Sequence, residues 1–198
     1  MKPVLIWVAC FTVIWLIFSP EKKVTLGNGI KVSQAPIQSE IEDPTSFNIK
    51  DYKVTPLAKF DIEAKVLAKK KYSFDPGAAV SPIDLALGWQ SMSDEEVLKD
   101  IEISQSNRWY YWRTQNMSIS KKDVISQSAN MHIIPANDYI EGLLKSVKTG
   151  QIVSISGSLV RVDAEKKNWH WKSSLTRNDT GNGSCELIYA DYVDIRTN

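Results

Sequence analysis

The chain has 198 residues, of which 43% are apolar and 24% charged, and a formal net charge of +1. This composition supports one folded domain of ordinary size and excludes an intrinsically disordered chain. Without the four charged residues that border its most apolar segment (Lys2, Glu21, Lys22 and Lys23), the rest lies one charge below neutral. Such a surface has no general attraction for phosphate backbones, so nucleic acid is not expected as a partner.

Residues 3–18 form an unbroken apolar run behind Lys2. A secretory signal needs a small-x-small cleavage site, but this run ends in bulky residues. A lipoprotein signal ending at Cys10 is a lesser alternative, because Trp7 stands where a small aliphatic residue is needed. As a helix the run rises about 24 Å against a hydrocarbon core of about 30 Å, and flanking lysines can snorkel across the difference. We therefore expect a retained transmembrane anchor at residues 1–20.

The polar stretch that follows contains Pro36 and Pro44 and few apolar residues. It predicts a flexible leash over residues 21–55, and a globular domain over residues 56–198. Lysines flank both ends of the anchor, so the positive-inside rule barely separates the two orientations. No cluster of positive charge blocks translocation, which favours a domain outside the cytoplasm.

Apolar residues at every second position from Phe60 to Ala68, with Asp61, Glu63, Lys65 and Leu67 between them, predict a long half-buried strand. The sequence Ser81-Pro82-Ile83-Asp84 has the pattern of a helix N-terminus, and predicts a short helix that stops at Gly88. Ser93-Asp94-Glu95-Glu96 repeats a capping pattern before a second short helix.

Further along the chain, strands are predicted at 101–104, 108–113 and 131–134, and a short helix at 121–125. Asn137 is expected to cap a helix that runs to about Val147, with Gly150 closing it. Three strands are predicted to finish the chain, at 152–162, 169–173 and 185–195. Gly157, inside the first of these, suits a bulge or a bend.

This order of elements predicts an α+β domain built on a small antiparallel β-barrel with inserted short helices. A capped helix between the third and fourth of five strands resembles the oligonucleotide/oligosaccharide-binding (OB) fold. The resemblance concerns the fold alone and does not identify a ligand.

The most polar segment is 173–186, whose Asn, Asp, Gly and Ser residues are typical of a long hairpin loop. The alternative is a binding loop in which Arg177, Asp179 and Glu186 line one edge of the barrel. Asp179-Thr180-Gly181 also spells the catalytic triplet of aspartic proteases. That family embeds the triplet between apolar strand residues, whereas here polar residues flank it, so we set this interpretation aside.

His132 could act as a general base with Cys185 or Ser173 as the nucleophile and an acid such as Asp179. Nothing in the sequence brings these residues together, and a hydrogen-bonded structural histidine is the competing interpretation. The two histidines are far apart in the chain, so no metal site is predicted. No cofactor motif is present either.

Aromatic residues gather in the run from Trp109 to Trp112 and again at Trp169 and Trp171. With Arg108 beside them, they could form a stacking platform for sugar rings or for a protein partner. The alternative is that half of these rings belong to the core and the others cover a sheet face.

Four segments, 74–94, 103–113, 128–136 and 173–187, together resemble an uncharacterised family of bacterial single-pass membrane proteins. The resemblance implies a bacterial inner-membrane protein and no particular chemistry. We therefore expect a membrane-anchored periplasmic module that binds a partner protein or an envelope glycan. The alternative is a hydrolase that uses His132.

Overall fold

The computed structural model describes residues 23–164, 168–176 and 185–196. The predicted anchor at residues 1–20 lies outside these ranges. Within the ranges, no helix combines the length and the apolar character needed to cross a membrane.

The structure is mostly β with a few short helices, which confirms the predicted α+β class. Its elements are β1 (Ile37–Ser39), β2 (Phe47–Ile49), β3 (Tyr52–Lys71), β4 (Ile83–Gly88), the 3-10 helix η1 (Gln90–Ser93), α2 (Glu95–Leu98), β5 (Ile101–Ser106), β6 (Trp109–Thr114), α3 (Lys121–Ser126), β7 (Ser128–Pro135), α4 (Asp138–Ser146), β8 (Ile152–Ala164), β9 (Trp169–Lys172) and β10 (Glu186–Arg196).

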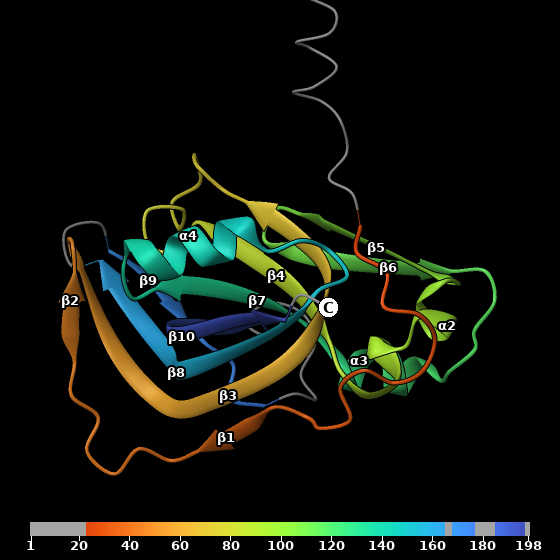
Figure 1. Cartoon of the computed structure of the whole chain (residues 1–198). Coiled ribbons are helices and arrows are strands. Elements are labelled where there is room, and N and C mark those ends of the chain that lie inside the picture. The colour runs from red at the N-terminus through yellow and green to blue at the C-terminus, as the bar shows by residue number, and fades with distance from the viewer. Residues whose placement is uncertain (1–22, 165–167, 177–184, 197–198) are drawn as a thin grey trace, which may run out of the picture.

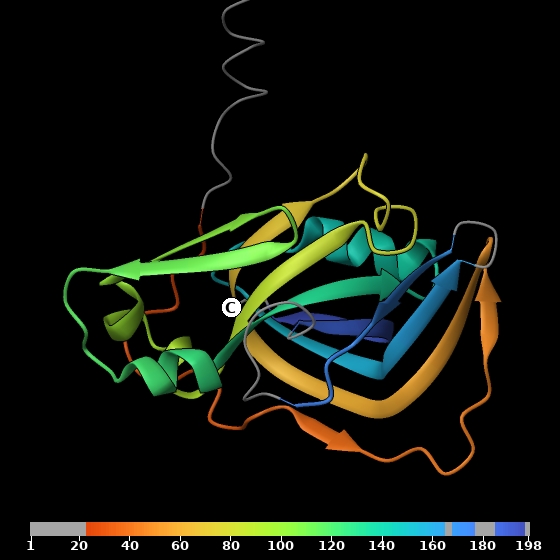
Figure 2. The ribbon, with the colours of Figure 1, turned by 180° about the vertical axis from the view of Figure 1, so that it is seen from behind.

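The long strand β3 closes the main sheet on itself (Figures 1 and 2). Its residues 53–65 pair antiparallel with β8, and its residues 65–71 pair antiparallel with β4. β4 pairs with β7, β7 with β10, and β10 with β8, so the pairing returns to β3 in a ring of five strands. The sequence predicts an antiparallel barrel, but β7 and β10 pair in parallel, so the prediction is wrong for this pair.

Local irregularities bend the strands around this ring. β3 changes register between Pro56 and Ala58 and again between Val66 and Ala68. Bulges of this kind increase twist and curvature, which a strand needs in order to serve two partners. Gly157 lies opposite an irregularity of its partner β10 rather than within a bulge of its own. A Cβ atom at Gly157 would lie 1.9 Å from the Tyr189 carbonyl oxygen, so close strand approach requires the glycine.

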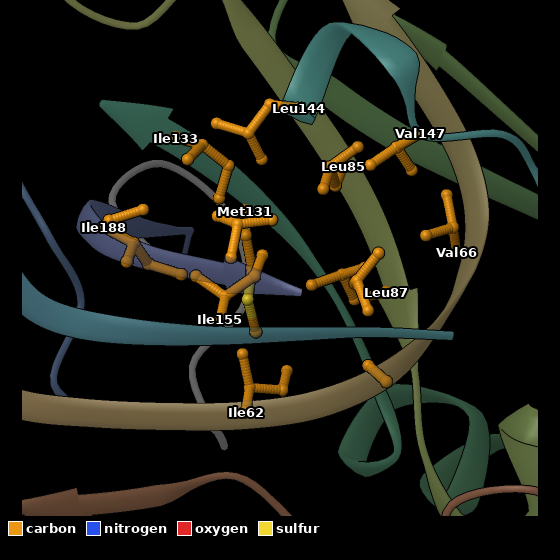
Figure 3. Close-up of a cluster of buried hydrophobic side chains, with 14 of the residues drawn as sticks. Ile62, Val66, Leu85, Leu87, Met131, Ile133, Leu144, Val147, Ile155 and Ile188 are labelled. Carbon is orange, nitrogen blue, oxygen red and sulfur yellow. The ribbon is translucent and has the colours of Figure 1, made fainter. Parts of the chain in front are cut away.

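The core fills the inside of the ring. Figure 3 shows apolar side chains from all five strands directed toward a common centre. Leu144 and Val147, from α4 and the residues after it, cover this core from one end. Asn137 caps α4 as predicted, because its side chain accepts a hydrogen bond from Ile140 N–H.

The predicted helix at 83–88 is wrong: this segment is strand β4, and all six of its residues are buried. Ile83, Leu85 and Leu87 face the barrel core, while Ala86 packs in a second cluster on the outer side. A strand buried on both faces loses the alternating pattern that identifies strands in a sequence. Without that pattern, Ser81 and Pro82 indicate the start of a helix, although the segment after them is a strand.

The structure also differs from the predicted leash over 21–55. β3 begins at Tyr52, before the expected domain boundary at residue 56. Earlier residues already pack on the domain: Val24 N–H donates to Thr149 O at 2.8 Å, and Val32 is 3% exposed. β1 and β2 then pair with β3. Sequence composition shows that a segment is polar, but not that a neighbouring sheet edge binds its backbone.

A buried ion pair ties this N-terminal segment to the barrel. Lys65 Nζ lies 2.7 Å from Glu95 Oε1, and the lysine side chain is completely buried. Glu95 also accepts a hydrogen bond from Leu26 N–H at 2.7 Å. Burial tends to raise the pKa of Glu95, but the hydrogen bonds from Lys65 and Leu26 and the lysine charge outweigh it, so the pKa is lowered.

We predict that Glu95→Gln destabilises the full chain by about 3 kcal/mol, because it leaves the Lys65 ammonium buried without its counter-charge. The matched variant Glu96→Gln, which breaks a pair with Lys99, should cost far less, because both side chains are more than half exposed. Urea unfolding in detergent measures both changes.

Since the Glu95 pKa is lowered by folding, the stability that Glu95 contributes is present above its unfolded pKa of about 4.3 and is lost as the pH falls through the folded value. If the difference in unfolding free energy between the wild type and Glu95→Gln does not shrink as the pH falls, the Glu95–Lys65 ion pair is not its cause.

Candidate functional site

A pocket of about 640 Å³ lies where three segments meet over strand β7. The segments are the loop between β3 and β4, the turn of the β5–β6 hairpin, and β9. The lining residues are Lys71, Tyr72, Ser73, Phe74, Asp75, Pro76, Gly77, Asn107, Arg108, Trp109, His132, Trp169, His170, Trp171, Lys172 and Cys185.

Arg108 is the centre of the polar network at this pocket. Its Nη1 lies 2.7 Å from Asp84 Oδ1, and its Nε and Nη2 donate to the carboxylate of Asp75 at 2.8–3.1 Å. Asp84 is fully buried in β4, and Asp75 is half-buried in the loop. Arg108 therefore joins the barrel wall to the loop through charge-assisted hydrogen bonds.

Aromatic rings hold the guanidinium in place. Its Cζ lies 3.7 Å from the ring centre of Tyr72 and 5.4 Å from that of Trp171. Both distances suit cation–π attraction. Burial raises the pKa of the Tyr72 hydroxyl, which stays protonated and accepts a hydrogen bond from Arg108 N–H at 3.0 Å.

The hairpin turn that carries Arg108 is strained. Asn107 and Arg108 have φ values of 51° and 69°, in the left-handed region, and they are the two turn residues between the paired Ser106 and Trp109. Such turns favour Asn at the first position and Gly at the second, so arginine at the second position costs conformational energy. The Arg108 carbonyl accepts a hydrogen bond from Asn130 Nδ2 at 3.0 Å, which helps to hold the turn.

His132 lies beside the same acid. Its Nδ1 is 2.9 Å from Asp84 Oδ1, but the direction does not suit a hydrogen bond, so the pair is a charge contact only when His132 is protonated. Trp171 packs against the imidazole, with ring centres 4.5 Å apart. Asp84 Oδ2 has no hydrogen-bond partner in the part of the chain that the structure describes. One acceptor of the buried Asp84 carboxylate is therefore unsatisfied among the described residues, behind the lining residues Arg108 and His132.

The upper part of the pocket has a different character. Lys71, His170 and Lys172 are exposed, while Trp109, Trp169 and Trp171 are half-buried. Asp75 and Asp84 together carry one negative charge more than Arg108 supplies. Lys71 and Lys172 bring the formal charge of these five side chains to +1 and are the cations at the mouth of the pocket. This combination suits a ligand with flat apolar faces and anionic groups.

The structure brings together four of the predicted site residues: Arg108, Trp109, His132 and Cys185 all line the pocket. Glu186 is buried at the start of β10 and is not among the lining residues. Arg177 and Asp179 lie outside the described residues, as does the Asp179-Thr180-Gly181 triplet.

Ser173, the alternative nucleophile, has a structural role instead. It is 3% exposed, and its hydroxyl donates to the Ser174 carbonyl and accepts from Leu187 N–H. The bond from Leu187 attaches the segment after β9 to the start of β10.

Sequence reasoning missed Tyr72, Asp75 and Asp84. Asp84 did carry a signal, because it is the one acid in the apolar stretch from Val80 to Leu87. An acid in a buried strand needs a partner and marks a candidate site. When the segment is predicted to be a helix, Asp84 is explained as a capping acid and no longer indicates a site.

The chain matches no known family model, no curated protein and no solved structure. The resemblance to a family of single-pass membrane proteins therefore stays a prediction. In the described part of the chain, no group of three or more His, Cys, Asp and Glu side chains could hold a metal ion.

We predict that Arg108→Gln lowers the free energy of unfolding by about 3 kcal/mol, since Asp84 would stay buried without its counter-charge. The matched variant is Arg161→Gln, which removes a similar two-pronged contact to Asp163 at the surface. This control should cost far less, because the contact lies at the solvent-exposed surface. Thermal unfolding of the full chain in detergent compares the two, and equal losses would contradict a special role for Arg108.

Proposed function

We propose that the protein is a membrane-anchored periplasmic module that binds an envelope glycan carrying carboxylate groups. The observation that carries the proposal is the pocket, with its tryptophans, its lysines at the mouth and the Arg108 network at its floor. Sugar rings stack on aromatic faces, and carboxylates pair with lysines, while the Arg108 network holds the walls in place. The apolar run at residues 3–18 is the proposed anchor in the inner membrane.

We also propose that the barrel is of the OB class. Counted along the chain, its five strands are β3, β4, β7, β8 and β10, and α4 lies between the third and the fourth. Their order around the ring is first, second, third, fifth, fourth, with the third and fifth strands parallel. OB barrels bind ligands over their second and third strands, between the loop after the first strand and the loop before the fifth. The pocket occupies the corresponding position here.

The segment 173–186 supports the same site. Lys172 lies just before this segment and Cys185 lies near its end, and both line the pocket. Arg177 and Asp179 are therefore proposed to contact the same ligand. The surface charge of the domain continues to argue against nucleic acid as that ligand.

We predict that Trp109→Ala weakens binding of muramidase-released peptidoglycan fragments at least tenfold, in line with about 1–3 kcal/mol for one stacked ring. Tyr111→Ala is the matched control, because Tyr111 is on the same strand, is 51% exposed and is not a lining residue of the pocket. Titration calorimetry on the full chain in detergent gives both affinities. Binding that survives Trp109→Ala, or that Tyr111→Ala weakens as much, would count against the pocket.

A hydrolase is the second candidate, and one observation favours it. His132 and Cys185 line the same pocket, and Asp84 lies beside the His132 ring. This residue set resembles a thiol nucleophile with a base and an orienting acid.

The two functions differ in what happens to the fragments. A binding module returns them with unchanged masses after long incubation. A hydrolase produces smaller products, and Cys185→Ser should abolish them while leaving the fold intact. Mass spectrometry of the incubated fragments distinguishes these results.

A further inference from the structure

We propose that the face of the domain around Lys23 lies directly on an anionic membrane surface, and that the Phe74 side chain enters the headgroup layer. The inference rests on the proposed anchor at residues 3–18. It does not depend on which ligand occupies the pocket.

The first argument is the length of the tether. Val24 is already hydrogen-bonded to Thr149 of the domain. Only residues 19–23 separate the apolar run from this point of attachment. Fully extended, five residues span at most about 18 Å, while a domain of this size is roughly 40 Å across. If the run crosses the bilayer, the domain cannot stand clear of the membrane by even half its own width.

The second argument is which elements surround the point of attachment. A Cβ atom at Gly150 would lie 1.8 Å from the Val24 carbonyl oxygen, so the N-terminal segment presses against the turn after α4. Lys69 Nζ donates to the carbonyl oxygens of Lys145 and Val147, which holds the end of β3 against the same turn. The loop between β3 and β4 continues from there. In Figures 1 and 2 this loop forms the highest point of the coloured ribbon, on the side where the described chain begins.

The third argument is the chemistry of this face. Phe74 is fully exposed at 102% of its reference area, although a large apolar side chain gains by leaving water. Lys23, Lys70, Lys71 and Lys148 are exposed on the segments just described. Lysines next to a protruding aromatic ring are typical of surfaces that bind anionic lipid headgroups.

Most acidic residues near this face already form ion pairs. Glu141 of α4 pairs with Lys145, and Asp75 pairs with Arg108. Glu95 pairs with the buried Lys65. Asp138, at the start of α4, is exposed. The lysines therefore outnumber the unpaired acids on these segments.

The test uses the full chain with Cys10→Ser and Cys185→Ser, reconstituted in phosphatidylglycerol nanodiscs without glycan. A fluorophore at Phe74→Cys should be strongly quenched by headgroup spin labels. The matched site is Ile37→Cys, which is 60% exposed. Ile37 belongs to β1, and in Figure 1 this strand lies at the opposite end of the molecule from the β3–β4 loop. A fluorophore at this site should not be quenched.

Charge is tested on the same labelled protein. Lys70→Gln with Lys71→Gln should lower the ratio of docked to undocked domain by about 25-fold, since each lysine near an anionic surface contributes a factor of about five. Zwitterionic nanodiscs should have a similar effect. Equal quenching at positions 74 and 37, or no quenching at 74, would overturn the proposal, and so would failure of the chain to insert into nanodiscs. None of these readouts depends on glycan binding, so the two proposals can fail separately.

Discussion

The double pairing of strand β3 is the constraint on which the rest of the structure depends. Near Lys65 the strand turns from β8 to β4, and this change of partner closes the barrel. Lys65 sits at the corner, where its side chain points away from the core and is fully buried under Glu95 and the N-terminal segment. A buried ammonium is tolerated only with a matching charge, so closing the barrel and attaching the N-terminal segment are coupled. The same strand then continues to Lys71, where the β3–β4 loop that lines the pocket begins.

The pocket gathers tryptophans and exposed lysines in a chain that is nearly neutral as a whole. Arg108 is paired with both Asp75 and Asp84 and is held by two aromatic rings. Its role is therefore to fix the hairpin turn against the barrel, and the strained backbone at this turn is compensated by those contacts. In the proposed function, selectivity comes from the tryptophans and the exposed lysines. Because these contacts already hold Arg108 in place, the proposed ligand would meet preformed walls and lose little binding energy to reorganisation.

Much of the fold was predictable from the sequence, and the exceptions have one physical cause. The strands from Ile101 onward, the capped α4 and the α+β class follow from periodicity and capping residues, which are local signals. The strand β4 and the packed segment from Val24 to Val32 were missed because their structure depends on partners distant in the chain. The same holds for the site. Trp109 and Arg108 were found through composition, whereas Asp84 becomes informative only when β4 is known to be a buried strand.

The packing of the N-terminal segment also changes what the apolar run implies. A leash of 35 residues would let the domain search a wide volume above the membrane. With residues from Val24 onward bound to the barrel, only a few residues remain between the run and the folded domain. If the run is the proposed anchor, this short connection favours an orientation with the β3–β4 loop toward the bilayer. That loop also forms one wall of the pocket, so on this proposal the pocket opens close to the membrane surface. The proposed glycan would then have to lie near the membrane, which favours a module acting on material at the bilayer over one that binds distant partners.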